Sequence, residues 1–74
     1  MFDKIRDVIL EYVDMPKESI TPDTTFLADM HMNSLDIMTM IGQLEDEYDI
    51  TIETEDLSDI FTMQQLVDYI EERL

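Results

Sequence analysis

Apolar side chains recur at helical spacing along most of this chain, and this periodicity constrains the fold more than any other feature. It predicts helices from Phe2 to about Val13, from Ser34 to about Tyr48, from Glu55 to Ile60, and from Thr62 onward. The positions expected to face the core are Phe2, Ile5, Val8, Ile9, Tyr12, Val13, Leu35, Ile37, Met38, Met40, Ile41, Leu44, Tyr48, Leu57, Ile60, Met63, Leu66, Val67, Ile70 and Leu74. The pattern therefore predicts an all-α fold, a small four-helix bundle of three longer helices and one short helix.

The two longer connections carry apolar residues of their own. Residues 15–32 form a long first loop, in which Ile20, Phe26 and Leu27 are too apolar for a free linker and should plug into the core. Residues 49–54 alternate like a strand, but no second strand is available to pair with them. We therefore expect an extended segment with Ile50 and Ile52 inserted into the core, followed by a short helix that Thr54 caps.

Two helix ends carry further signals. Thr62 and Gln65 have the spacing of a capping box, and Phe61 with Leu66 has the spacing of a hydrophobic staple. The last turn of the second helix contains only acids at residues 45–47, which is the unfavourable sign for the helix dipole. Because these acids destabilise the end of the helix, their presence favours a role in binding a partner.

The size of the chain limits it to one domain over residues 1–74 with one small core. There is no cysteine for a disulfide, and His31 is the only strong soft ligand, so no metal site is expected. No EF-hand loop and no glycine-rich phosphate loop is present. The N-terminus alternates in charge and no apolar run reaches membrane-spanning length, which predicts a cytoplasmic protein.

The charge balance is strongly acidic. Four basic residues against nineteen acidic ones give a formal net charge of −15 at pH 7. Nucleic acid and anionic membrane are excluded as direct partners, because both require a basic face. Basic protein surfaces are favoured instead, through electrostatic steering of the encounter. Disorder is disfavoured, since 45% of the residues are hydrophobic and they recur periodically.

A capped helix start surrounds Ser34. Asn33 is a preferred N-cap residue, and Asp36 falls at the third helical position, where an acid suits the dipole. Met32 and Ile37 have the spacing of a hydrophobic staple across this cap. A phosphate attached to Ser34 would be well held by the free amides of the first turn. Spacing alone leaves two interpretations open, an ordinary helix start and an attachment point.

Catalysis by this serine is disfavoured. His31 and Asp29 lie close to Ser34 in the sequence, but a triad also needs an oriented base, an oxyanion hole and a substrate cleft. A loop in so small a domain does not offer these, so we expect no enzyme activity and a solvated His31. The remaining hypothesis is a serine that another enzyme modifies, on a domain that supplies the docking surface.

The chain resembles the acyl carrier proteins, small four-helix domains that bear phosphopantetheine. The resemblance covers essentially the whole chain and is carried by residues 20–26, 44–50 and 62–70 together with Asn33-Ser34-Leu35-Asp36. The serine motif alone is short. Its position, its flanks and the length and charge of the chain make the match specific.

This resemblance implies that a phosphopantetheinyl transferase attaches 4′-phosphopantetheine to Ser34 from coenzyme A, with magnesium. The terminal thiol of that arm would hold acyl chains as thioesters, which explains thiol chemistry in a chain without cysteine. Acyl-processing synthase enzymes would dock through basic patches. The positions that match the docking surface are Asn33, Leu35, Asp36, Met38, Glu45 and Asp46, and more loosely Glu55, Asp56 and Asp59.

Three positions depart from the family pattern. Asn33 replaces the usual aspartate before the serine, His31 stands where the family favours glycine, and Glu53 stands where it often has proline. The first two departures touch the docking site and bear on which pathway the carrier serves.

Two classes of function therefore remain. The first is a monomeric carrier that shuttles acyl intermediates between enzymes of fatty acid biosynthesis, or else a specialised carrier for polyketide, aminoacyl or modified-lipid synthesis. The second is an acidic helical interaction module without a prosthetic group. The acidic second helix and the length of the chain favour the fatty acid carrier.

Overall fold

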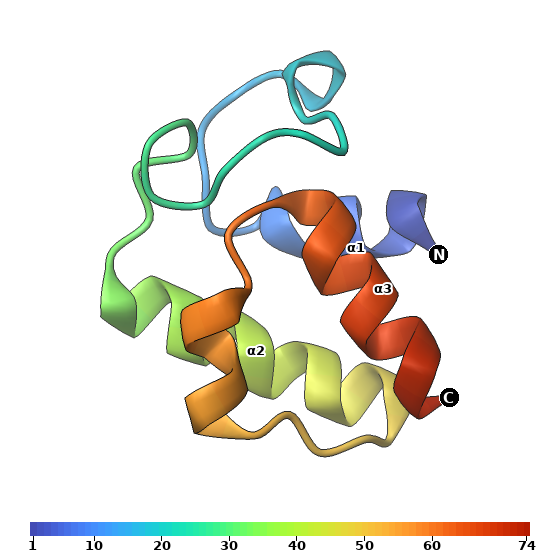
Figure 1. Ribbon diagram of the computed structural model, residues 1–74. Coiled ribbons are helices and arrows are strands. Elements are labelled where there is room, and N and C mark those ends of the chain that lie inside the picture. The colour runs from blue at the N-terminus through green and yellow to red at the C-terminus, as the bar shows by residue number, and fades with distance from the viewer.

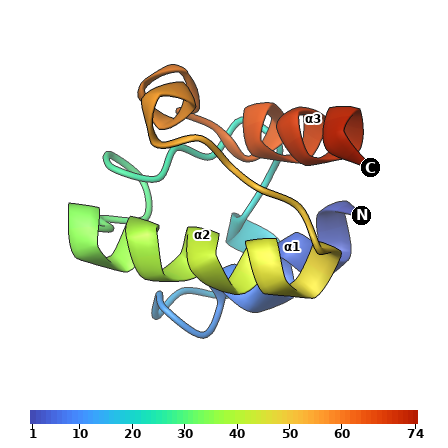
Figure 2. The same cartoon turned by 90° about the horizontal axis from the view of Figure 1, so that it is seen from below.

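The computed structural model describes residues 1–74, and its regular structure is helical (Figure 1). Its elements are α1 (Phe2–Ile9), η1 (Lys17–Ser19), α2 (Ser34–Tyr48), η2 (Thr54–Asp59) and α3 (Met63–Arg73), where η denotes a 3₁₀-helix. α1 contacts both α2 and α3. η2 lies at the same end of the molecule as the start of α2, on the left in Figures 1 and 2. The predicted architecture is confirmed, with η1 as an addition, and no helix combines the length and apolarity needed to cross a membrane.

One cluster of fifteen buried apolar side chains joins the three α-helices and both connections. Its members are Ile5, Val8, Ile9, Ile20, Phe26, Met30, Met32, Met40, Ile41, Leu44, Ile52, Met63, Leu66, Val67 and Ile70. Four of these are methionines, whose unbranched and polarizable side chains fill irregular gaps between elements of unequal length. The methionines therefore let loop residues and helices of different length share one core.

The long first loop is an ordered part of this core. Ile20 and Phe26 are buried as predicted, and Met30 and Met32 add two further anchors. Leu27 was expected to be buried with them, and this prediction is wrong, because its side chain is 61% exposed. Phe26 occupies the inward position at this point of the loop, so the next residue along faces outward.

Backbone hydrogen bonds attach the loop to the start of α3. The Met63 N–H donates to the Thr24 carbonyl at 3.0 Å, and the Phe26 N–H donates to the Phe61 carbonyl at 3.1 Å. An isolated antiparallel bridge joins Thr25 to Thr62 at the same place. Donors that would otherwise be orphaned at the N-terminus of α3 are thus satisfied by the loop.

α2 has the predicted bounds, but only its second half is buried. Met40, Ile41 and Leu44 are core residues, whereas Leu35 and Met38 are 75% and 48% exposed. The prediction that these two residues face the core is wrong. The inward face of α2 runs from the half-buried Ile37 to the buried Ile41 and Leu44, and Leu35 lies on the opposite side of the helix, about two and a half turns before Leu44.

The ends of α1 and α3 differ from the periodic pattern. α1 ends at Ile9, four residues before the predicted Val13, and continues as a turn in which the Tyr12 N–H donates to the Ile9 carbonyl at 2.8 Å. Tightened bonds of this kind are common where a helix ends. Leu74 lies beyond the last residue of α3 and is 65% exposed, so its predicted burial is wrong. The Thr62 and Gln65 capping box is confirmed.

η2 replaces the predicted short α-helix. It starts at Thr54, one residue earlier than predicted, and its N-cap is Glu53 with no side-chain cap bond, so the prediction that Thr54 caps it is wrong. Leu57 and Ile60 are half-buried against the core. The segment before η2 is extended and unpaired as predicted, with Ile52 buried and Ile50 half-buried.

Candidate functional site

The start of α2 is built by a cap and an anchor. The Asn33 Oδ1 accepts a hydrogen bond from the Asp36 N–H at 2.8 Å, and Asn33 has the extended backbone of an N-cap residue. Met32, directly before the cap, is buried in the core. The chain is therefore fixed on one side of Ser34 by packing and on the other by a hydrogen bond, and the predicted cap is confirmed.

Ser34 is the first residue of α2, and its side chain is exposed. The cap satisfies the Asp36 amide, while the amides of Ser34 and Leu35 have no acceptor within the chain. Unsatisfied amides and the helix dipole make this end of α2 favourable for negative charge. A phosphodiester on the Ser34 hydroxyl would fit both the exposure and the electrostatics of this position.

The residues that invited a catalytic interpretation are arranged differently. The Asp29 carboxylate accepts hydrogen bonds from the Thr25 N–H at 2.8 Å and from the Thr25 hydroxyl at 3.0 Å. The bond from the Thr25 amide is the main reason that the pKa of Asp29 lies below its usual range. Asp29 thus closes a turn in the loop and orients no base toward Ser34. His31 is exposed, as predicted.

His31 has a backbone conformation that sequence reasoning missed. Its φ of 56° lies in the left-handed region, which costs a residue with a Cβ atom roughly 1–2 kcal/mol and which glycine adopts freely. The chain makes this sharp turn three residues before Ser34, between buried Met30 and buried Met32. The family preference for glycine at this position was the signal that could have revealed it.

A pair of exposed apolar side chains stands beside Ser34. Leu35 follows it directly and Met38 lies one turn further on, and both are predicted docking residues. Large apolar side chains that a protein leaves in water often mark a contact surface. Their exposure is what a binding surface next to the serine requires.

An apolar cavity of about 390 Å³ begins one turn along α2 from Ser34. Ile37 and Ile41 of α2 form one wall, and Leu57 and Ile60 of the η2 segment form another. The full lining comprises Thr25, Phe26, Leu27, Ala28, Ile37, Ile41, Leu57, Ser58, Ile60, Phe61 and Leu66. Leu27 and the 56% exposed Phe61 mark where the cavity meets the surface.

Comparison with known proteins identifies the family to which a chain with this serine and this cavity belongs. The family model described as "Phosphopantetheine attachment site" matches residues 3–70. The chain belongs to the phosphopantetheine-binding acyl carrier protein family. Acyl carrier proteins of Chlorobium phaeovibrioides and Chlorobium luteolum are each 40% identical over 68 residues, which cover 92% of this chain and 87% of theirs.

The fold agrees with this assignment. A solved structure of the acyl carrier protein from Enterococcus faecalis superposes with a TM-score of 0.85 at 27% sequence identity, over 99% of this chain and 92% of that one. Members of the family are carriers without catalytic activity, and they bear phosphopantetheine. The alternative of an interaction module without a prosthetic group therefore falls. Family membership also implies a phosphopantetheinyl transferase and acyl-processing enzymes as partners.

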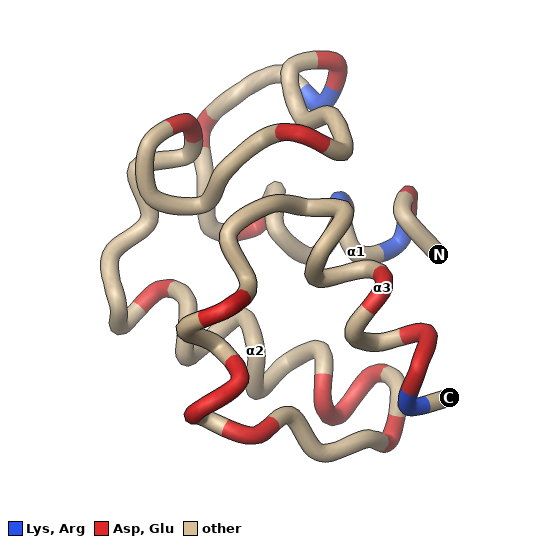
Figure 3. The backbone as a smooth tube through the Cα atoms, in the orientation of Figure 1, with Lys and Arg blue, Asp and Glu red and all other residues tan.

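The acids are distributed over the whole chain and are densest in residues 45–72. Figure 3 shows them along the second half of α2, the segment after it, η2 and α3, and also in α1 and the first loop. Three of the four basic residues belong instead to α1 and η1, namely Lys4, Arg6 and Lys17. The second half of the chain is therefore the more acidic, and it contains all of the predicted docking acids except Asp36.

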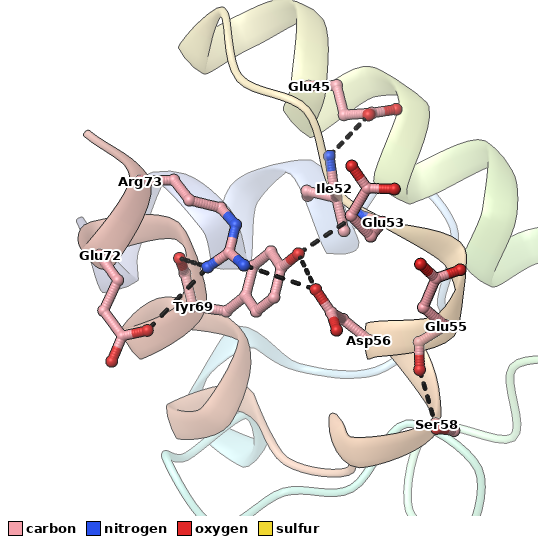
Figure 4. Close-up of polar contacts among 9 residues, drawn as sticks. All are labelled: Glu45, Ile52, Glu53, Glu55, Asp56, Ser58, Tyr69, Glu72 and Arg73. Carbon is pink, nitrogen blue, oxygen red and sulfur yellow. Dashed lines mark hydrogen bonds and ion pairs between the residues drawn. The ribbon is translucent and has the colours of Figure 1, made fainter.

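Two of those acids already have partners inside the chain (Figure 4). The Glu45 carboxylate accepts a hydrogen bond from the Ile52 N–H at 2.8 Å and so attaches the segment after α2 to that helix. The Asp56 carboxylate accepts from the Tyr69 hydroxyl at 2.6 Å and pairs with Arg73 at 3.4 Å. Both contacts join separate segments of the chain, and spacing along the chain gave no sign of them. Asp46, Glu55 and Asp59 are exposed, and none has a hydrogen bond or ion pair from its side chain.

Replacing His31 by glycine should stabilise the fold. His31→Gly removes the cost of the left-handed conformation, and we expect it to raise the free energy of unfolding by about 0.5–1 kcal/mol relative to wild type. His31→Ala retains that cost and should be less stable than His31→Gly by about 1 kcal/mol. Urea denaturation of the three proteins measures both differences. Equal stability of the glycine and alanine variants would show that the backbone at this position is not strained.

Proposed function

We propose that Ser34 carries the 4′-phosphopantetheine group and that residues 1–74 act as one carrier domain, a cytoplasmic monomer that shuttles acyl chains in fatty acid biosynthesis. The observation that carries the attachment is the exposed hydroxyl at the N-terminus of α2, beside two unpaired amides. The bound group supplies the thiol that this cysteine-free chain lacks.

The other two serines are less suited to this role. Ser58 donates its hydroxyl to the Glu55 carbonyl at 2.9 Å within η2, and Ser19 ends the three-residue η1. Neither lies at the N-terminus of a long helix, where the aligned dipoles add up. The contrast between Ser34 and Ser58, both exposed, supplies a matched pair for the experiment below.

The cavity supports an aliphatic acyl chain as the cargo. The two hydroxyls in its lining are already engaged, since Thr25 donates to Asp29 at 3.0 Å and Ser58 donates to Glu55. A saturated chain would gain about 0.8 kcal/mol for each buried methylene. A polyketide or aminoacyl group would instead bury oxygen or nitrogen atoms without partners, which costs free energy. This contrast favours fatty acid synthesis over the specialised alternatives.

The proposed docking surface combines the exposed apolar pair Leu35 and Met38 with the acids around them. It comprises Asn33, Leu35, Asp36, Met38, Glu45, Asp46, Glu55, Asp56 and Asp59. Because Glu45 and Asp56 also hold the fold together, we expect the exposed Asp46, Glu55 and Asp59 to contribute most of the steering charge. A basic patch on a transferase or synthase enzyme is the complementary surface.

The attachment is tested by intact-mass spectrometry after incubation with coenzyme A, magnesium and a promiscuous phosphopantetheinyl transferase. Wild type and the control Ser58→Ala should each gain one phosphopantetheine, and Ser34→Ala should gain none. Loading of Ser34→Ala would place the group on another residue. Failure of wild type to load would contradict the proposed carrier role.

The cargo is tested by loading the arm with acetyl, octanoyl or 3,5-dioxooctanoyl groups and measuring thermal unfolding. Three or four buried methylenes of octanoyl should stabilise the fold by roughly 2–3 kcal/mol relative to acetyl. The dioxo chain, of the same length, should stabilise it much less, because its two carbonyls find no free donor in the cavity. If the dioxo chain stabilises the fold as much as octanoyl, a specialised carrier becomes the better proposal.

The docking surface is tested by comparing Asp46→Lys with Glu71→Lys. Both acids are exposed, and both substitutions change the net charge equally. Asp46→Lys should lower kcat/KM for arm transfer several-fold at low ionic strength, and Glu71→Lys should change it little. Raising the salt concentration should reduce the difference. Equal losses would mean that only the net charge matters.

A further inference from the structure

η2 is a wall of the cavity with little stability of its own. It contains six residues, none of them fully buried, and no side chain caps its start. Leu57 and Ser58 of this helix and the following Ile60 line the cavity. A 3₁₀-helix is less stable than an α-helix because its hydrogen bonds have poorer geometry. Contacts from outside η2 must therefore keep this wall in place.

Two side chains of α3 supply those contacts (Figure 4). The Tyr69 hydroxyl donates to the Asp56 carboxylate at 2.6 Å and accepts from the Glu53 N–H at 3.2 Å. The Arg73 guanidinium donates to the same Asp56 oxygen at 3.4 Å and lies 3.5 Å from the centroid of the Tyr69 ring. One tyrosine thus bonds both the N-cap residue and the first turn of η2, and the arginine reinforces it.

We infer that Tyr69, Arg73 and Asp56 form a clasp that holds η2 closed over the cavity, and that opening this clasp gives access to the cavity. Its connection with an acyl chain depends on the function proposed above. The clasp is polar and partly solvated, so it can break while the helices stay packed: Ile70 and Leu66 of α3 remain fully buried in the core. Opening η2 exposes its half-buried Leu57, the following Ile60 and the apolar lining of the cavity, and no fully buried residue of η2.

The clasp itself is tested on the protein without its arm, with Tyr69→Phe and the matched control Tyr12→Phe. Tyr12 is also half-buried and also donates its hydroxyl over a long sequence separation, to Gln43 at 2.5 Å, but it lies away from η2. The reporters are the amides of Asp56 and Ile60, which bond to the carbonyls of Glu53 and Leu57 and not to Tyr69.

Hydrogen exchange measured by NMR gives the result. Tyr69→Phe should accelerate exchange at both reporter amides about tenfold, because a hydrogen bond to a charged group is lost. This increase should exceed any change in the global free energy of unfolding, and Tyr12→Phe should leave both amides unchanged. Equal effects of the two variants, or changes at Asp56 and Ile60 that only follow global stability, would overturn the clasp.

The link to the cavity is tested with an octanoyl-loaded protein whose terminal methyl carries ¹³C. A chain in the cavity lies near the rings of Phe26 and Phe61, which shift the methyl resonance. Tyr69→Phe should move this resonance toward its position in octanoyl-coenzyme A, and Tyr12→Phe should not. If Tyr69→Phe accelerates exchange in η2 but does not move the methyl resonance, the gating role is overturned and the clasp remains. A methyl that is unshifted already in wild type would contradict the proposed placement of the chain, and would end the gating role with it.

Discussion

The backbone bonds between the first loop and the start of α3 are the contacts on which the rest of this structure depends. They fix Thr24 and Phe26 against Phe61 and Met63, and this brings residues of the first loop and of the start of α3 to one side of the cavity. The loop then reaches α2 through two buried methionines, so the position of Ser34 follows from how the loop packs. A helix start that must present a modified side chain to other enzymes is thus held by the core rather than by the exposed turns around it.

Electrostatic repulsion is the second constraint, since nineteen acids face only four basic residues. Three of the four basic side chains form ion pairs, and two of these pairs join separate elements. Lys4 of α1 pairs with Glu47 at 2.5 Å, and the hydrogen bond from this contact is the main reason that the pKa of Lys4 is raised. It compensates part of the unfavourable charge at the end of α2. Arg73 does the same for η2, so the scarce cations lie where acids would otherwise push elements apart.

Most helix caps and most core positions could be predicted from the sequence, and several contacts between separate elements could not. The cap at Asn33, the capping box at Thr62 and the bounds of α2 depend on residues within one turn of each other, and all three are confirmed. The exposure of Leu35 could also have been predicted, because Leu35 lies about half a turn out of phase with the buried Leu44, whereas the left-handed turn at His31 depends on where its flanking methionines are buried. The hydrogen bond of the docking acid Glu45 likewise joins α2 to the segment after it, and the periodicity of the sequence does not reveal how close these two segments lie.

A domain of this size has little apolar surface to bury, yet it leaves a cavity of about 390 Å³ unfilled. Filling it with larger side chains at Ile37 or Ile41 would stabilise the fold and remove the space for a guest. The structure instead closes the cavity on one side with η2, an element attached by polar bonds from Asp56 to Tyr69 and Arg73 and by half-buried apolar residues. The stability of the core and access to the cavity thereby depend on different elements. The helices keep the core intact, and the weakest element is the one that must move for a chain to enter or leave.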